Sequence, residues 1–254
     1  MIKADFPSVV DYEIPAFLAD ADADLVNTTQ PFYEPPRNDT NAVYAIFIGT
    51  NDLGNIAFLT DSQVPGKVLS EYTDCVYGAF DSLYAAGGRF FILMNTVPLY
   101  LAPQYANDSL HGVTASQYYP DKGPNHTEIA YTMHQETTSV NDIFKYQTPY
   151  EVLVANRYPG AHFALFDTWQ LFSDIYNHPA AFLNGTHPLS VEGFEHHCNL
   201  TGGDCTYKYN NTRPDSFMWY DELHPRCVFE RSKCFAVMHL LTLIPVNKLN
   251  AFWQ

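Results

Sequence analysis

The sequence predicts an α/β protein built in three layers, with helices packed on a parallel sheet. Three continuous apolar runs, at residues 42–48, 90–94 and 163–166, have the length and composition of strands buried on both faces. Segments with apolar residues at helical spacing lie between these runs. The alternation of such strands and helices is typical of a parallel sheet with crossover helices.

Length and composition indicate a single globular domain that covers residues 1–254. The chain is 46% hydrophobic and 16% charged, a composition able to bury a full core. Its formal net charge of -15 argues against nucleic acid and against anionic membrane surfaces, because both select basic patches. The sequence has no apolar run of about 18 residues and therefore predicts no transmembrane helix.

The first third of the chain has the pattern helix, loop, strand and helix. Residues 8–26 carry an apolar stripe at helical spacing, with Pro15 in its middle. Residues 27–41 form a polar loop rich in Pro and Asn. Residues 67–86 carry a second apolar stripe, and Gly87 supplies a signal for the end of that helix.

The next helices follow a long polar loop. Residues 101–135 form this loop, which we expect either to line a cleft or to stand exposed. Residues 137–157 are predicted to be helical, with an interruption at Pro149. A short helix is expected after the third strand, with a capping side chain at Asp167 or Thr168.

Seven N-glycosylation triplets indicate a secreted protein. About two would arise by chance in this composition, so we expect some to carry N-linked glycans; compositional bias in an Asn- and Thr-rich chain is the alternative. A second long loop, residues 184–216, is rich in them. The acceptor residues are Asn27, Asn38, Asn107, Asn125, Asn184, Asn199 and Asn210. No signal-peptide segment follows Met1, so we expect the N-terminus to be incomplete and the export signal to be lost with it.

The five cysteines suggest local disulfides. Cys198 with Cys205, and Cys227 with Cys234, each enclose six residues, a spacing that suits disulfide-closed loops. A zinc site is disfavoured because neither spacing is a usual ligand spacing and no CxxC occurs. Cys75 is left over, and is either a buried core thiol or a residue whose partner lies in a missing upstream region.

His224 is the best candidate for a catalytic base. Its unperturbed pKa near 6.5 allows an imidazole to accept and return a proton at neutral pH. Asp221 lies three residues earlier, a spacing that can bring its carboxylate to one imidazole nitrogen in a turn. The alternative is an Asp-His pair on a solvated turn without catalytic function.

Asn51 is a candidate donor to a developing oxyanion. It follows the predicted strand at residues 42–48, and active residues in parallel sheets lie beyond the carboxyl ends of strands. Its side-chain amide can stabilise negative charge in a transition state. Gly49-Thr50-Asn51-Asp52 is also a good loop sequence, so turn formation is the alternative role.

These segments resemble two conserved blocks of the SGNH (GDSL-type) hydrolases. Residues 45–55, Ala-Ile-Phe-Ile-Gly-Thr-Asn-Asp-Leu-Gly-Asn, resemble the third block, and residues 217–225, Phe-Met-Trp-Tyr-Asp-Glu-Leu-His-Pro, resemble the fifth. Residues 156–161 and 166–169 are similar to the secreted carbohydrate-esterase and acetylesterase branch, family 16, from fungi. The resemblance covers most of residues 8–225.

The resemblance implies a flavodoxin-like sheet and the hydrolysis of short acyl esters on sugars through an acyl-enzyme. It assigns Asn51 as an oxyanion-hole donor, His224 as the base and Asp221 as the residue that orients the base. The expected substrate is a small acyl ester or an acetylated sugar. We expect neither a cofactor nor a metal in this chemistry.

Three features depart from the family pattern. No Gly-Asp-Ser nucleophile block and no second block with an oxyanion-hole glycine occur, so we expect the first two strands of the fold to be lacking and one side of strand 42–48 to be exposed. Residues 226–254 do not follow the pattern either. Ser8 lies in a helix start, not in a strand-to-helix turn, and is a poor substitute nucleophile. We therefore assign no nucleophile and expect little or no esterase activity from this chain.

Other candidate residues carry weaker signals. His196-His197-Cys198 suggests a metal ligand set, but no second cluster has ligand spacing, so a surface loop is favoured. Several aromatic residues near the C-terminal motif can stack on sugar rings, although aromatic residues are more often core. They are Tyr207, Tyr209, Trp219 and Tyr220.

Three functions compete. The leading hypothesis is a partial SGNH-type ester hydrolase that acts on acetylated carbohydrate with Ser-His-Asp chemistry. A second is a non-catalytic secreted glycoprotein that uses the same cleft to bind glycans. A third is a lipid or phospholipid ester hydrolase, which ranks lower because no apolar lid segment is evident.

Overall fold

A computed structural model describes residues 8–21, 29, 38–208 and 213–226. Contacts divide the chain into two compact units, which we name for their main features. The sheet unit comprises Met1–Asp52, Ile56–Asn95 and Ser139–Phe166. The histidine unit comprises Leu53–Asn55, Thr96–Thr138 and Asp167–Gln254. The single-domain organisation stays a prediction.

None of the helices in the described ranges combines the length and apolar character needed to cross a lipid bilayer.

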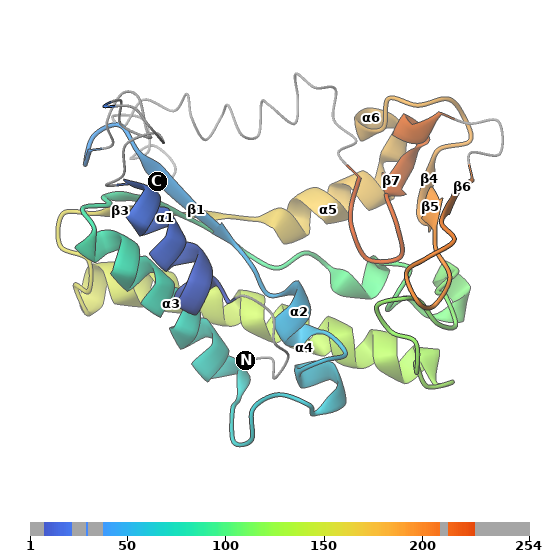
Figure 1. Ribbon diagram of the computed structural model, residues 1–254, viewed down its shortest axis with the longest axis horizontal. Helices are drawn as coiled ribbons and strands as arrows, with labels where there is room; N and C mark the ends of the chain where they lie inside the picture. The colour runs from blue at the N-terminus through green and yellow to red at the C-terminus, as the bar shows by residue number, and fades with distance from the viewer. Residues whose placement is uncertain (1–7, 22–28, 30–37, 209–212, 227–254) are drawn as a thin grey trace. The chain divides into compact units, whose positions relative to one another are not determined.

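The sheet unit is built on three parallel strands in the order β1-β2-β3 (Figure 1). They are β1 (Val43–Phe47), β2 (Phe90–Met94) and β3 (His162–Phe166). Each matches a predicted apolar run to within one residue at either end. The predicted fold class, α/β with a parallel sheet of the three-layer kind, is confirmed.

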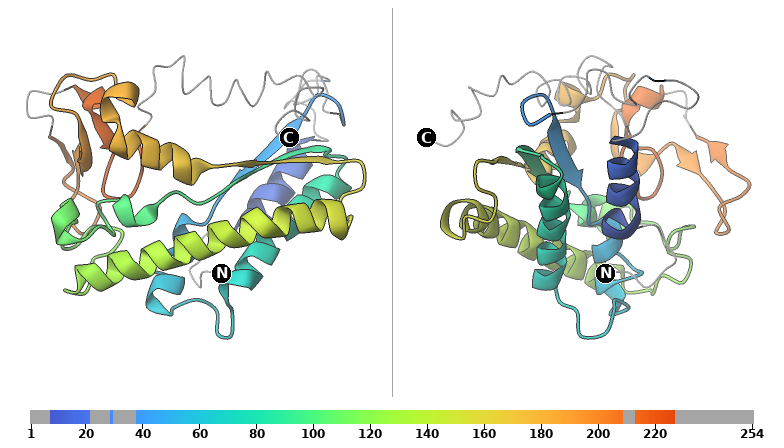
Figure 2. Two further views of the ribbon diagram at one scale, coloured as in Figure 1. Left: turned by 180° about the vertical axis from the view of Figure 1, so that it is seen from behind. Right: turned by 60° about the vertical axis from the view of Figure 1, so that its left-hand side comes forward.

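Helices α1 and α3 contact one another in the sheet unit (Figures 1 and 2). The helices in or entering this unit are η1 (Val9–Glu13), α1 (Ile14–Ala21), α2 (Thr50–Leu53), η2 (Phe58–Thr60), α3 (Leu69–Ala85), α4 (His126–Pro149) and η5 (Tyr150–Val154). Glu71 accepts a hydrogen bond from the Val68 N–H at the start of α3. Gly87, at φ 93°, follows its end in the left-handed region that glycine adopts without strain.

The predicted helix at residues 8–26 is two helices in the structure. A π-helical turn, η1, is followed by α1. Pro15 lies at the second position of α1, directly after η1. The end of the predicted helix lies outside the described residues.

An aromatic cluster fills the core of the sheet unit. Phe80 of α3 packs edge-to-face on Phe91 of β2 and Phe163 of β3, with ring centroids 5.5 and 5.2 Å apart. Tyr158 lies 4.7 Å from Phe163 and is 2% exposed. These contacts attach α3 to the paired strands β2 and β3, and such aromatic pairs stabilise a core beyond the area they bury.

Strand β1 is an edge strand of the described sheet and is only half buried. Val43 and Phe47 are 44% and 49% exposed, whereas Ile46 between them is 7% exposed. The prediction that this run is buried on both faces is therefore wrong for β1, although it holds for β2. The expectation of an exposed edge agrees with the strand order.

The histidine unit contains short helices and two small sheets. Its elements besides the start of α4 are η3 (Leu99–Leu101), η4 (Asp108–Leu110), α5 (Thr168–Asn177), α6 (Pro179–Phe182), β4 (Ser190–Phe194), β5 (His196–His197), β6 (Thr206–Tyr207), η6 (Pro214–Ser216) and β7 (Phe217–Trp219). Strand β4 pairs with β7 in parallel, and β5 pairs with β6 antiparallel. The predicted loop at residues 184–216 is thus partly strand.

Helix α4 begins 11 residues earlier than predicted (Figure 2). Asn125 caps it, because its side-chain oxygen accepts a hydrogen bond from the Glu128 N–H at 3.2 Å. The helix ends at Pro149, close to the predicted interruption. Residues 101–106, expected in a loop that lines a cleft or stands exposed, are buried.

The structure tests the predictions made for the helix cap after the third strand and for the cysteines. Asp167 caps α5 by accepting a hydrogen bond from Gln170 N at 3.0 Å. Cys198 and Cys205 form the predicted disulfide. Cys75 is a free thiol and is exposed, which excludes the first of its two predicted alternatives, a buried core thiol. Cys227 and Cys234 lie outside the described residues.

Candidate functional site: a carboxylate–histidine pair

Asp221 and His224 form a closed turn directly after β7. The Asp221 Oδ1 atom accepts hydrogen bonds from the backbone N–H groups of Leu223 and His224, at 2.9 and 2.7 Å. The His224 Nδ1 atom lies 3.0 Å from both carboxylate oxygens. Tyr220 N donates to His224 O at 2.8 Å and closes the other side of the turn. The predicted Asp-His contact is therefore present.

Burial differs sharply between the two side chains. The side chain of Asp221 is 3% exposed and that of His224 is 55% exposed. A buried carboxylate that keeps one imidazole nitrogen occupied leaves the other nitrogen, Nε2, to exchange a proton. The local sequence produces this arrangement because an Asp side chain readily bonds the backbone two and three residues further on.

Hydrogen bonding sets the protonation of the pair. Burial alone would raise the pKa of Asp221, but hydrogen bonds from His224 and Leu223 outweigh it and lower that pKa. The hydrogen bond with Asp221 raises the pKa of His224, and burial opposes this only in part. The pair thus favours an ionised aspartate and a more basic histidine.

Tyr118 is a member of the site that sequence analysis missed. Its hydroxyl donates to Asp221 Oδ2 at 2.9 Å, and its ring packs edge-on against His224 with centroids 5.2 Å apart. Burial and the hydrogen bond to Asp221 raise the pKa of Tyr118 well above its usual value. Tyr118 precedes Asp221 by 103 residues, and its position in a long loop was the only available signal.

A polar network supports the backbone of Tyr118. Asn55 donates to the carbonyl oxygen of Tyr118 at 2.9 Å. Gln104 and Tyr105 donate to the side-chain oxygen of Asn55 at 3.4 and 3.3 Å. The backbone N–H of Gln104 donates to Glu222 O at 2.7 Å. The last residue of the Gly-Thr-Asn-Asp-Leu-Gly-Asn segment therefore helps to hold the tyrosine that contacts Asp221.

The segment after the pair is anchored by charge. Arg226 forms an ion pair with Glu195, which is 1% exposed. The backbone N–H of Arg226 also donates to Met218 O at 2.8 Å. Removal of one partner from a buried ion pair of this kind strongly destabilises the folded protein, because the other charge stays buried and unpaired. The described part of the chain after Pro225 thus returns to β7.

Asn51 lies in the sheet unit, at the first turn after β1. Gly49 precedes it at φ 125°, a conformation that requires glycine. The Asn51 side chain is exposed, and among the described residues it takes part in no hydrogen bond. Asp221 and His224 belong to the histidine unit. The structure therefore joins two of the three predicted site residues and assigns Asn51 to the other unit.

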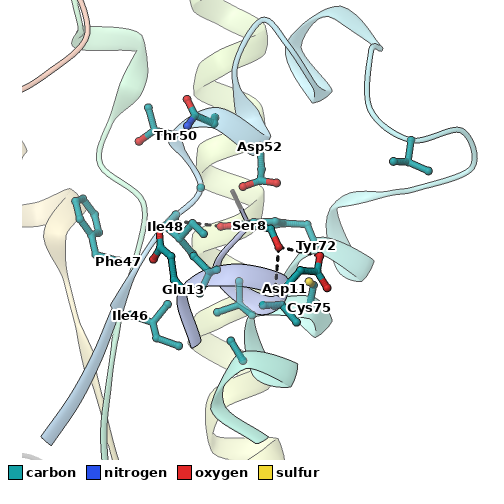
Figure 3. A pocket seen from close by; sticks show the side chains of 17 residues that line it. Ser8, Asp11, Glu13, Ile46, Phe47, Ile48, Thr50, Asp52, Tyr72 and Cys75 are labelled. Atoms are coloured by element: carbon teal, nitrogen blue, oxygen red, sulfur yellow. Dashed lines mark hydrogen bonds between the residues drawn. The ribbon is translucent and has the colours of Figure 1, made fainter. Parts of the chain in front are cut away.

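A cavity of about 710 Å³ adjoins Asn51 within the sheet unit (Figure 3). The carboxyl end of β1, η1 and α3 contribute its lining, which includes Gly49 and Ser8. Ser8 caps η1: its Oγ accepts from Asp11 N at 2.9 Å and donates to Asp11 Oδ2 at 2.8 Å. Ser8 thus has a structural role, as its predicted place at a helix start implied.

The weaker candidates also have defined places. His196, Cys198 and Cys205 bring possible ligand atoms within 4.8 Å of one another, but the two sulfurs are joined in a disulfide. His196 and His197 form strand β5, not the surface loop expected for them. Trp219 is 0% exposed, so its assignment as a sugar-stacking residue is excluded and its core role holds.

A parallel α/β sheet and a buried aspartate that contacts a half-exposed histidine are features that hydrolases with a histidine base also have. A scan against models of protein families finds no match. Among characterised proteins, the chain is 40% identical to an acetylesterase from Hypocrea jecorina over 254 residues, which is 100% of this chain and 69% of that protein.

A second relative supports the same relationship over a shorter stretch. An acetylesterase from Thermothelomyces thermophilus is 31% identical over 68 residues, which is 27% of this chain and 22% of that protein. The chain therefore belongs to the acetylesterase family that includes the Hypocrea jecorina protein.

Proposed function

We propose that the chain is an ester hydrolase of the SGNH type that removes acetyl groups from carbohydrate. The observation that carries the proposal is the contact of His224 Nδ1 with both carboxylate oxygens of Asp221 at 3.0 Å. Both relatives described above are acetylesterases, and this supports acetyl as the acyl group. The substrate is accordingly a small acetyl ester, and its sugar part follows from the resemblance to the carbohydrate esterases.

In this proposal His224 acts as general base and then as general acid. Its Nε2 atom takes the proton of the attacking hydroxyl and returns it to the leaving alcohol oxygen, while Asp221 stabilises the imidazolium that forms in between. Tyr118 fixes the carboxylate through the hydroxyl contact at 2.9 Å. Asn51 donates its amide N–H to the oxyanion of the tetrahedral intermediate.

The nucleophile is the part of the mechanism that these residues do not supply. No Gly-Asp-Ser triplet occurs in the sequence, and Ser8 is engaged in capping η1. Members of a catalytic triad act as a unit, so a site that lacks its nucleophile loses on the order of 10⁶ in kcat and gains little from the remaining members. We therefore expect residues 1–254 alone to hydrolyse acetyl esters very slowly.

A chimera tests this function directly. The unaligned part of the Hypocrea jecorina acetylesterase would be joined to this chain, and turnover of p-nitrophenyl acetate and acetylated xylo-oligosaccharide would be measured. If this part supplies the nucleophile, we expect turnover at least about 10³-fold above that of residues 1–254. That gain should disappear in His224→Ala and remain in Ser8→Ala.

Two outcomes would each contradict one part of the proposal, the first the missing nucleophile and the second the role of His224. Robust turnover by residues 1–254, abolished by His224→Ala but not by Ser8→Ala, would show that the nucleophile lies elsewhere in this chain. A chimera that hydrolyses acetyl esters equally well with and without His224 would remove the histidine from the mechanism.

We also propose that the protein is secreted and glycosylated. The Cys198–Cys205 disulfide supports an oxidising compartment. Four acceptor residues of the glycosylation triplets are exposed in the described ranges, namely Asn38, Asn125, Asn184 and Asn199. Secretion and endoglycosidase sensitivity of the protein expressed in a fungal host would test this, and an unglycosylated intracellular product would contradict it.

A glycan-binding protein without catalysis is the second candidate function, because the sequence has no Gly-Asp-Ser triplet. This function requires saturable sugar binding by residues 1–254 and a chimera that gains no esterase activity. A chimera with restored turnover would exclude it.

A further inference from the structure

Three aromatic rings of the histidine unit form one cluster, which we call the aromatic platform: His196, Tyr207 and Tyr220. His196 is stacked on Tyr220 with centroids 4.9 Å apart and planes 16° apart. Tyr207 lies 4.8 Å from His196. The hydroxyl oxygens of Tyr207 and Tyr220 are 3.3 Å apart. The rings therefore form one packed cluster in which the two tyrosine hydroxyl groups lie close together.

Backbone pairing and a disulfide hold this cluster in place. His196 of β5 is the ladder partner of Tyr207 in β6. The Cys198–Cys205 disulfide closes the hairpin between these two strands. The backbone N–H of His196 donates to Tyr220 O at 2.8 Å and attaches the hairpin to the segment after β7. A surface fixed in this way loses little conformational entropy when a ligand binds.

The platform borders the carboxylate–histidine pair. Tyr220 is the residue immediately before Asp221, and its N–H donates to the carbonyl oxygen of His224 at 2.8 Å. Electrostatic interaction with Tyr220 contributes to the raised pKa of Tyr118, although burial and Asp221 contribute more.

Exposure separates the platform from the core aromatics around it. Tyr207 keeps 53% of its surface exposed, whereas Trp219, one residue before Tyr220, keeps none. Exposed single tyrosines are common on protein surfaces and need no explanation. Three rings held together beside a candidate base differ from a single exposed tyrosine, because they can bind a ligand jointly. Each tyrosine offers a rigid apolar face together with a hydroxyl group.

We propose that the aromatic platform is a subsite for the neutral sugar rings of the acetylated glycan. The apolar C–H face of a pyranose packs on the Tyr207 side of the cluster, and the tyrosine hydroxyls bond sugar hydroxyl groups. The net charge of -15 favours an uncharged glycan over a uronic-acid polymer. The proposal rests on the proposed function, since it assigns the sugar part of the same substrate.

Binding of unacetylated xylohexaose, measured by calorimetry and by NMR shift mapping, tests the subsite without any ester chemistry. We expect saturable binding, with a dissociation constant raised about five- to tenfold in Tyr207→Ala because one stacking contact is lost. Tyr207→Phe keeps the ring but loses its hydroxyl contact, so the dissociation constant should rise less than in Tyr207→Ala. Tyr131→Ala is the matched control, because Tyr131 is 61% exposed in the same unit but lies on α4.

Each outcome has a definite consequence. Equal binding by Tyr207→Ala and the parent chain, equal weakening by Tyr131→Ala, or no xylohexaose binding would overturn the platform. Preference for hexagalacturonate would overturn its assignment to neutral sugars. Because xylohexaose has no ester bond, sugar binding that depends on Tyr207 in a chain whose chimera hydrolyses no ester would support the platform and reject the proposed function.

Discussion

Two turns in this molecule carry the residues expected to do chemistry, and they are built in opposite ways. The turn after β7 buries Asp221 and satisfies its carboxylate with backbone, imidazole and phenol donors. The turn after β1 exposes Asn51, whose side chain takes part in no hydrogen bond within the described ranges. The side chain of Asp221 therefore stabilises its own turn through hydrogen bonds. The side chain of Asn51 makes no such contribution to the turn after β1.

This difference fits the roles that we propose for the two groups. A base has to be held in one tautomer and one orientation before the reaction starts, so its partner must be buried and fully bonded. An oxyanion donor is needed only when negative charge develops, and its N–H must be available at that moment. Stability should therefore respond strongly to changes in the first turn and weakly to changes in the second.

Removal of the Asp221 carboxylate should have the largest effect. Asp221→Ala leaves the N–H groups of Leu223 and His224 and the hydroxyl of Tyr118 without their acceptor, so we expect a loss of about 3 kcal/mol in the free energy of unfolding. Urea titration followed by circular dichroism measures this loss. The control is Asp121→Ala at an exposed loop position, expected within about 0.5 kcal/mol. Equal losses in the two variants would show that the hydrogen bonds of Asp221 do not stabilise the fold more than an exposed carboxylate does.

Loss of the Tyr118 hydroxyl should have a smaller effect. Tyr118→Phe removes one hydrogen bond to a charged group while its ring remains, and we expect a loss of about 1.5 kcal/mol. In this variant the Asp221 carboxylate no longer shares its negative charge with the phenol hydroxyl and interacts more strongly with the imidazolium. The pKa of His224 should therefore rise further. NMR titration of the imidazole signals measures that change.

Tyr119→Phe is the matched control for this prediction, because Tyr119 is the buried neighbour of Tyr118. It should leave the His224 titration unchanged. A His224 pKa that stays constant in Tyr118→Phe would mean that the phenol does not influence the pair.

Acid should weaken the fold less than removal of the Asp221 carboxylate, because protonation neutralises the group without deleting it. The folded-state pKa of Asp221 is lowered, so its contribution to stability is present above the unfolded value near 4 and is lost as pH falls through the folded value. For His224 the folded-state pKa is raised, so its contribution is present below about 6.5 and is lost as pH rises through the folded value.

The pH dependence of unfolding in Asp221→Asn tests both signs. This variant has no carboxylate to protonate and no charge to raise the pKa of His224, so both contributions should disappear. A variant with the same dependence on pH as the parent chain would place the titrating groups elsewhere.

Sequence analysis succeeded where the signal is local. The contact of Asp221 with His224 spans three residues, so turn chemistry alone predicts it. Strand β2 is apolar throughout and buried, and its pattern was sufficient. The cap at Asp167 and the disulfide at Cys198 likewise depend on short spacings.

Two of the failures depend on distant contacts. Tyr118 meets Asp221 across 103 residues, a pairing that no spacing rule contains. The apolar run of β1 resembles that of β2, but its place at the edge of the described sheet leaves Val43 and Phe47 half exposed. Exposure is set by which elements pack on a strand, and the composition of the strand itself does not record it.

The smallest effect on stability is expected from substitution of Asn51. Asn55, four residues later, is the matched residue for comparison. Asn51→Ala should change the free energy of unfolding by less than about 0.5 kcal/mol, because its exposed side chain bonds nothing in the described structure. Asn55→Ala should cost about 1–2 kcal/mol, since Asn55 donates to Tyr118 O and accepts from Gln104 and Tyr105. Urea titration of both variants decides between a side chain available for catalysis and one required for structure; a cost at Asn51 equal to that at Asn55 would end its candidacy as a free donor.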